Sequence, residues 1–190
     1  MRKFATVAAV AAAMMAFAGA SSASAASWSA QNTGLFGPSK TMQFTSQAGN
    51  ITYCPGQIPS WSGKASGAVL SWAGPSLTGC NVSTGGTASI TPSGQWSLTA
   101  STVSSVALKA DTVPSGGTVL TIKQAQTGCI IAVKGPLSLS GLPWNNSTHT
   151  FALENSVAIQ ASGPGFCNGI IGSSMIITGT ISIPGETILP

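Results

Sequence analysis

Charged side chains are scarce in this chain. Asp, Glu, Lys and Arg make up 5% of its 190 residues, against roughly 25% in an ordinary soluble protein. Arg2 is the single arginine, so without residues 1–25 the chain keeps five lysines, three carboxylates and a net charge of about +2. Nucleic-acid binding needs clustered Lys and Arg that displace counterions. Five scattered lysines do not meet that need, and we expect no nucleic-acid partner.

Groups that carry acid–base chemistry are equally few. The chain has three carboxylates, Asp111, Glu154 and Glu186, which lie far apart in sequence, and one histidine, His149. General acid–base catalysis needs such groups close together, and no G-x-S-x-G motif marks a nucleophile. A triad of His149, Asp111 and a serine, or a glycosidase pair of Glu154 and Glu186, is not supported by any spacing. We expect a strand-end histidine, no catalytic residues, no enzyme and no cofactor.

Metal-ligand motifs are missing as well. The chain has no C-x-x-C pair and a single His, which disfavours both a zinc site and a redox centre. Its four cysteines, Cys54, Cys80, Cys129 and Cys167, form an even set, which predicts two disulfides in an exported protein. Three pairings are possible, and we favour Cys54–Cys80 with Cys129–Cys167 because both loops are local and do not interleave. Each disulfide would stabilise the fold by roughly 3–4 kcal/mol on the chain-entropy model.

The prediction of export rests on residues 1–25. Met1-Arg2-Lys3 is a short positive start, residues 4–20 are uncharged and almost all apolar, and residues 23–25 read Ala-Ser-Ala. This order is typical of a secretory signal peptide, with cleavage expected between Ala25 and Ala26. The alternative is a transmembrane anchor, for which the apolar run is marginal in length. We expect a secreted, extracellular product without a membrane span after cleavage.

Long helical periodicity is also absent, and short strand patterns take its place. Runs rich in Val, Ile and Thr alternate with period two and are separated by Gly, Pro, Ser and Asn. This pattern predicts one all-β domain over 40–190, an antiparallel β-sandwich or barrel, after an irregular lead-in over 26–39. The expected strands are 40–45, 66–72, 86–91, 95–100, 102–109, 117–123, 129–134, 148–153, 156–161 and 174–183.

Tryptophan is the aromatic residue that stands out, with five copies against a single tyrosine. Trp72, Trp96 and Trp144 lie inside or next to strand patterns, which favours core packing. Trp28 and Trp61 have polar, Ser-rich neighbours and are the better candidates for exposure. Exposed indoles can stack on sugars or anchor a partner. We therefore take Trp28, Trp61 and Trp144 as the candidate ligand or partner contacts.

Three segments carry a resemblance to known proteins: residues 78–101, 128–144 and 163–169, with Ile51-Thr52-Tyr53-Cys54 before them. They resemble small secreted actinobacterial β-proteins of unknown function and, more distantly, the family named for a protein activator of alkane oxidation. The resemblance implies a signal peptide, an all-β domain and no established catalytic residues. It also implies that the four cysteines and Trp144 are framework residues. The chain departs from the pattern at Gln95, where the second segment has Leu-Pro before its Trp.

These features favour a secreted, non-enzymatic structural or interaction protein of the bacterial cell surface or extracellular medium. Weak charge repulsion would permit self-association or contact with the cell envelope and its polysaccharides. A carbohydrate-binding module that uses exposed Trp side chains is the alternative. An enzyme inhibitor is a third hypothesis, for which the sequence offers no reactive-loop signature.

Overall fold

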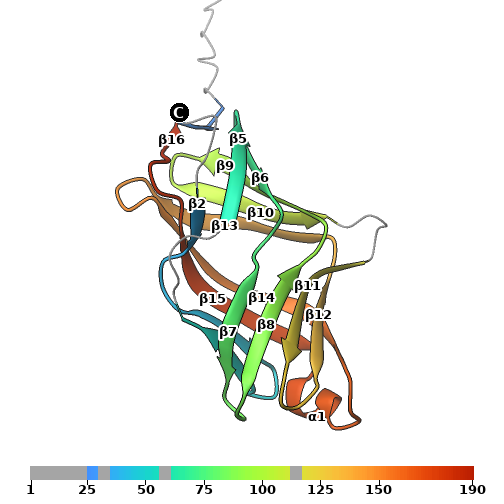
Figure 1. Ribbon diagram of the computed structural model, residues 1–190. Coiled ribbons are helices and arrows are strands. Elements are labelled where there is room, and N and C mark those ends of the chain that lie inside the picture. Colours follow the sequence, from blue (N-terminus) through green and yellow to red (C-terminus); the bar gives the residue numbers. More distant parts are fainter. Residues whose placement is uncertain (1–24, 30–34, 56–60, 112–116) are drawn as a thin grey trace, which may run out of the picture.

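The structure, a computed structural model, describes residues 25–29, 35–55, 61–111 and 117–190. The expected signal peptide, apart from its last residue, lies outside these ranges. The described chain is almost entirely β, with one short helix, and it has one continuous hydrophobic core. The predicted antiparallel all-β fold is confirmed, and it is a barrel (Figure 1).

The elements are short and follow one another closely. They are β1 (Ser27–Trp28), β2 (Leu35–Pro38), β3 (Met42–Ser46), β4 (Ile51–Cys54), β5 (Trp61–Ser66), β6 (Val69–Trp72), β7 (Leu77–Val82), β8 (Thr87–Pro92), β9 (Gln95–Thr102), β10 (Ser105–Asp111), β11 (Thr118–Gln124), β12 (Ile130–Lys134), β13 (Leu137–Asn145), β14 (Thr150–Ser162), α1 (Cys167–Ile171), β15 (Ser174–Ser182) and β16 (Ile188–Leu189).

Eight antiparallel strands form a closed ring in the lower half of the molecule (Figure 1). Their order around the ring is β3, β4, β7, β8, β11, β12, β14 and β15, and β15 pairs with β3 to close it. Within the described part of the chain, each strand of this ring is paired on both sides, which is how a closed barrel removes sheet edges.

The upper half repeats the same neighbour order. There β2, β5, β6, β9, β10 and β13 pair in that order around the ring, and the ends of β14 and β15 complete it. The pairs β2–β3, β4–β5, β6–β7, β8–β9, β10–β11 and β12–β13 therefore make the two halves of six long strands, and β14 and β15 each reach both halves. Among the described residues these form an up-and-down barrel of eight long strands, in which sequence neighbours pair and the last long strand pairs with the first.

The two halves meet at a level that we call the waist, marked by residues 73–76, 93–94 and 135–136. There β6 gives way to β7, β8 to β9 and β12 to β13. Gly74 and Gly94 have positive φ values of 94° and 77°, and the Gly135–Pro136 peptide bond is cis. Because Gly74 and Gly94 leave β geometry, two of the long strands are interrupted at this level.

Alternating side chains fill the barrel, as period-two patterning predicts. In β9, Trp96, Leu98 and Ala100 are buried, and their neighbours Ser97 and Thr99 are not. The same alternation runs through β15, as the sequence predicted. The interior is therefore a packed core contributed by all eight long strands.

Additional elements lie at both ends of the barrel (Figure 1). At the lower end, α1 is tied to the start of β12 by the Cys129–Cys167 disulfide. Above α1 lies a buried polar group, in which Gln124 Nε2 donates to Asn50 Oδ1 at 2.9 Å. At the upper end, β1 pairs with β16 in a two-stranded ribbon. The expected irregular lead-in over 26–39 thus contains β1 and β2, because Trp28 and the residues of β2 find ladder partners far along the chain.

Candidate functional site

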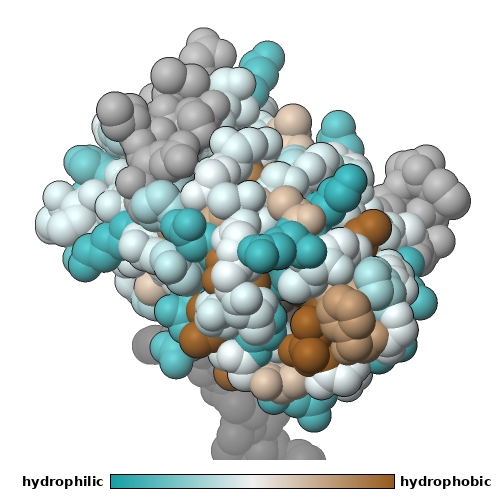
Figure 2. Space-filling model, turned by 60° about the horizontal axis from the view of Figure 1, so that its bottom comes forward, coloured by the Kyte–Doolittle hydropathy of each residue, from teal (hydrophilic) through white to brown (hydrophobic). Residues whose placement is uncertain are grey.

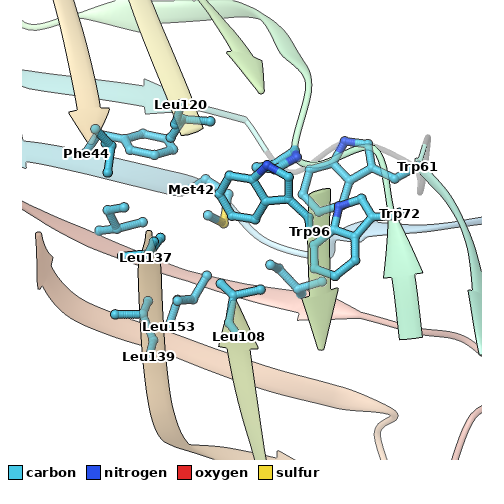
Figure 3. A pocket seen from close by; sticks show the side chains of 14 residues that line it. Met42, Phe44, Trp61, Trp72, Trp96, Leu108, Leu120, Leu137, Leu139 and Leu153 are labelled. Atoms are coloured by element: carbon cyan, nitrogen blue, oxygen red, sulfur yellow. The ribbon is translucent and has the colours of Figure 1, made fainter. Parts of the chain in front are cut away.

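An apolar cavity lies inside the barrel at the waist (Figure 3). Its volume is about 40 Å³ and its lining is entirely apolar. Figure 3 shows three indoles grouped on one side and several leucines on the other. Every one of the eight long strands contributes to the lining, which comprises Met42, Phe44, Trp61, Trp72, Pro75, Trp96, Leu108, Leu120, Val133, Leu137, Leu139, Leu153, Ile177 and Ile181.

The tryptophan side of the cavity is held by hydrogen bonds that point away from it. Trp61 Nε1 donates to the Ser76 carbonyl at 3.0 Å, and Trp96 Nε1 donates to the Ser93 carbonyl at 3.2 Å. The rings of Trp72 and Trp96, cross-strand partners in β6 and β9, lie 6.1 Å apart with a 44° tilt. The polar edges of Trp61 and Trp96 are thus engaged by backbone, and the wall presents ring carbons.

Two glycines leave space for side chains that line the cavity. A Cβ on Gly74 would lie 2.5 Å from Trp96 and from Pro92. A Cβ on Gly179 would collide with the Met42 thioether on the neighbouring strand. Because neither position carries a side chain, Trp96 and Met42 can reach the cavity surface.

The upper end of the barrel is a second well-defined group. Trp28 is 1% exposed and packs edge-on against Trp144, with ring centroids 5.1 Å apart. The Asn146 side chain binds both the Trp144 indole and the backbone of Ile188 in β16. This network fixes the β1–β16 ribbon over the barrel mouth.

Polar groups gather beside the same ribbon. His149 lies in the turn before β14, with φ of 54°, rather than on the expected strand. Its Nδ1 is 2.6 Å from the Glu186 carbonyl, and because a carbonyl can only accept, Nδ1 carries the proton. The Ser29 hydroxyl donates to the Glu186 carboxylate at 3.3 Å and accepts from the Thr187 N–H. The Ser29 hydroxyl thus donates its proton to Glu186 and not to the His149 imidazole. This is the arrangement of a structural hydrogen-bond network and not that of a nucleophile with its base.

The outside of the barrel over β15, β3 and β4 presents two rows of side chains in register. One row is Ile176, Thr45 and Ile51, and the next is Thr178, Gln43 and Tyr53. We call these six residues the β15–β3–β4 face. Ile176 is 48% exposed and Tyr53 is 42% exposed. The face combines apolar, hydroxyl and amide groups and carries no charge.

The predicted tryptophan contacts are wrong as surface sites. Trp28, Trp61 and Trp144 are at most 5% exposed. Polar Ser-rich neighbours suggested exposure for Trp28 and Trp61, but in β5 the exposed Ser62 and the buried Trp61 occupy alternate positions of one strand, and Trp28 follows the half-buried Ser27 in the same way. Trp61 lines the waist cavity, and Trp28 and Trp144 close the upper end.

The cysteine prediction is confirmed, with disulfides Cys54–Cys80 and Cys129–Cys167. Cys54 and Cys80 continue the register of the neighbouring strands β4 and β7. The carboxylates are not gathered, since Glu154 is exposed on β14 and Glu186 is buried at the upper end.

The cavity leucines and Tyr53 were not among the site residues predicted from the sequence. Leu137 and Leu139 lie on β13, a strand that the pattern did not single out, although their spacing of two is its signal. Tyr53 follows the same rule in β4, between buried Thr52 and Cys54.

Within the described ranges, no group of three or more His, Cys, Asp or Glu side chains could hold a metal ion. No helix in the same ranges is long and apolar enough to cross a membrane. No family model matches the chain, and neither a curated protein nor a solved structure was found to be similar to it.

Proposed function

We propose that the chain is an exported, non-enzymatic protein of the bacterial cell surface or surrounding medium, acting as a structural or interaction protein through its outer surface. The observation that carries this proposal is the β15–β3–β4 face, where Tyr53 and Ile176 are exposed in register with Thr and Gln side chains. Burying such side chains against a partner is favourable, because each removes apolar area from water.

The packed interior of the barrel supports contact from outside. The β1–β16 ribbon lies at one end, and α1 with its disulfide lies at the other. Figure 2 shows the lower end, where hydrophobic areas are small and lie among weakly polar and hydrophilic ones. A surface with so few charges opposes the approach of a second copy or an envelope polymer only weakly.

Export is supported by two observations of different kinds. The sequence of residues 1–25 is typical of a signal peptide. The two disulfides are bonds that persist in oxidising compartments.

Carbohydrate binding is the second candidate, now centred on Tyr53 instead of tryptophan. Tyr53 pairs across the sheet with Gln43 on one side and Asn81 on the other. An exposed ring flanked by two amides offers an apolar face and hydrogen-bonding groups together, as sugar binding requires.

The test compares two lysine substitutions at exposed apolar strand positions. Ile176→Lys lies in the β15–β3–β4 face, and Val69→Lys lies on β6 in the upper half. We expect Ile176→Lys to weaken self-association or envelope binding about tenfold, because a charge must be desolvated in the contact. Sedimentation of the mature protein alone, and with isolated envelope polysaccharide, measures both. Equal behaviour of the two variants in both assays would remove the face from the proposal.

A further inference from the structure

We propose that the waist cavity is a binding site for a small, uncharged, apolar molecule of about three non-hydrogen atoms. A cavity of about 40 Å³ has room for about three water-sized groups, since each takes about 10–15 Å³. The site is separate from the β15–β3–β4 face and does not depend on the function proposed for it.

The chemistry of the lining decides which occupant fits. A buried water needs two to four polar partners, and the surface of this cavity is entirely apolar. Three indoles line the cavity: the N–H groups of Trp61 and Trp96 donate to the Ser76 and Ser93 carbonyls, and no polar atom, that of Trp72 included, contributes to the cavity surface. Water therefore gains little inside, and an apolar guest would supply the dispersion contacts that the lining atoms lack.

The indoles of Trp61, Trp72 and Trp96 add selectivity to the site. They present large polarisable surfaces on one side of the cavity, and the Met42 thioether adds another (Figure 3). Dispersion attraction grows with the polarisability of both partners, so guests with halogen, sulfur or unsaturated carbon atoms should bind better than saturated ones of equal size.

Entry is possible at the waist, where the ladders are interrupted. The breaks at 73–76 and 93–94 lie on neighbouring long strands, because β6 pairs with β9 above them and β7 pairs with β8 below them. Segments with few ladder hydrogen bonds open locally at lower cost than the whole fold. A guest of three heavy atoms needs only such a local opening.

Bromoethane is a suitable probe, since it has three heavy atoms and its bromine quenches indole fluorescence. Three of the five tryptophans line the cavity. We expect bromoethane to quench the folded, disulfide-bonded protein along a saturable curve. Bromide ion carries the same quencher but is charged, so it should give only a weak, linear effect.

Two cavity-filling variants test the location. Val133 lines the cavity, and Val106 is equally buried but does not. Val133→Ile should weaken bromoethane binding about tenfold or more by occupying its space, and Val106→Ile should leave it unchanged. Leu139→Phe, a larger filling on another wall, should abolish the saturable phase.

The proposal is overturned by either of two results. One is quenching by bromoethane that is linear and matches that of bromide ion. The other is a folded Val133→Ile protein whose fluorescence is quenched by bromoethane along the same saturable curve as that of Val106→Ile and the wild type. Val133→Ile adds a single methylene, so it decides the question even if Leu139→Phe does not fold.

Discussion

At the scale of single residues, the barrel interior depends on where side chains are missing. Gly74 packs against Trp96 at the waist and has φ of 94°, a conformation that side-chain-bearing residues rarely adopt. Gly67, in the turn between β5 and β6, also has positive φ, but a methyl group on it would meet no atom within 4 Å. Substitutions at these two glycines therefore separate the energetic cost of a positive φ from the energetic cost of a steric collision.

We expect Gly67→Ala to lose about 1–2 kcal/mol from positive φ alone. Gly74→Ala should lose about 1–3 kcal/mol more, because the new methyl group collides with Trp96 and Pro92. Urea unfolding followed by tryptophan fluorescence measures both. Equal losses at the two positions would show that the Gly74–Trp96 contact has no energetic weight.

Residue identity alone could not place Trp28 and Trp61. Trp28 follows Ser27 in a strand of two residues, too short for its alternation to be recognised. Trp61 begins β5, whose inward positions include Ala65 and whose outward ones are Ser and Lys. The inward direction of both indoles is set by distant partners, β16 for Trp28 and β2 for Trp61.

At the scale of elements, most strands with period-two alternation were predictable, and strands with a bulge at a glycine were not. The expected strands 86–91, 117–123 and 129–134 agree with β8, β11 and β12. The expected strands 148–153 and 156–161 are one strand, β14, because alternation continues through Glu154 and Ser156.

The strands β7 and β13 were missed for a common reason. Each contains a positive-φ glycine, Gly79 or Gly141, at a place where the register shifts against the neighbouring strand. Such a bulge puts two residues opposite one and breaks period two. A glycine inside a short run then resembles a turn in the sequence.

The short strand β1 gives an element-scale prediction. Trp28→Ala should destabilise the fold by about 3–5 kcal/mol, because the side chain is fully buried. In a double-mutant cycle with Trp144→Ala, we expect a coupling of about 0.5–1.5 kcal/mol from the edge-on ring pair. The same cycle with Trp96→Ala, at the waist, should give coupling within about 0.5 kcal/mol of zero. A Trp28→Ala protein as stable as wild type would mean that β1 is not part of the folded unit.

At the scale of the whole molecule, barrel closure could not be predicted from local pattern. Alternation and turn residues are shared by sandwiches and barrels, and both were expected. Closure requires β15 to pair with β3, with Met175 opposite Ser46 and Ile177 opposite Phe44. Those partners lie at opposite ends of the domain in sequence, so only the folded chain brings them together.

The waist cavity likewise depends on the whole barrel and not on any single strand. Apart from Pro75, which lies between β6 and β7, each lining residue occupies an ordinary inward position of its own strand. The void arises where the upper strands turn away from the lower ones, and the largest side chains, Trp61, Trp72 and Trp96, are drawn from three neighbouring long strands.

The central claim, that the protein acts through the β15–β3–β4 face, is tested most directly by Tyr53, the single tyrosine of the chain. Replacing it with 3-fluorotyrosine gives one fluorine NMR resonance, from the β4 side of that face. We expect this resonance to shift or broaden as protein concentration rises or envelope polysaccharide is added, and to stay unchanged in the Ile176→Lys variant. A wild-type resonance that does not move under either condition would contradict the claim.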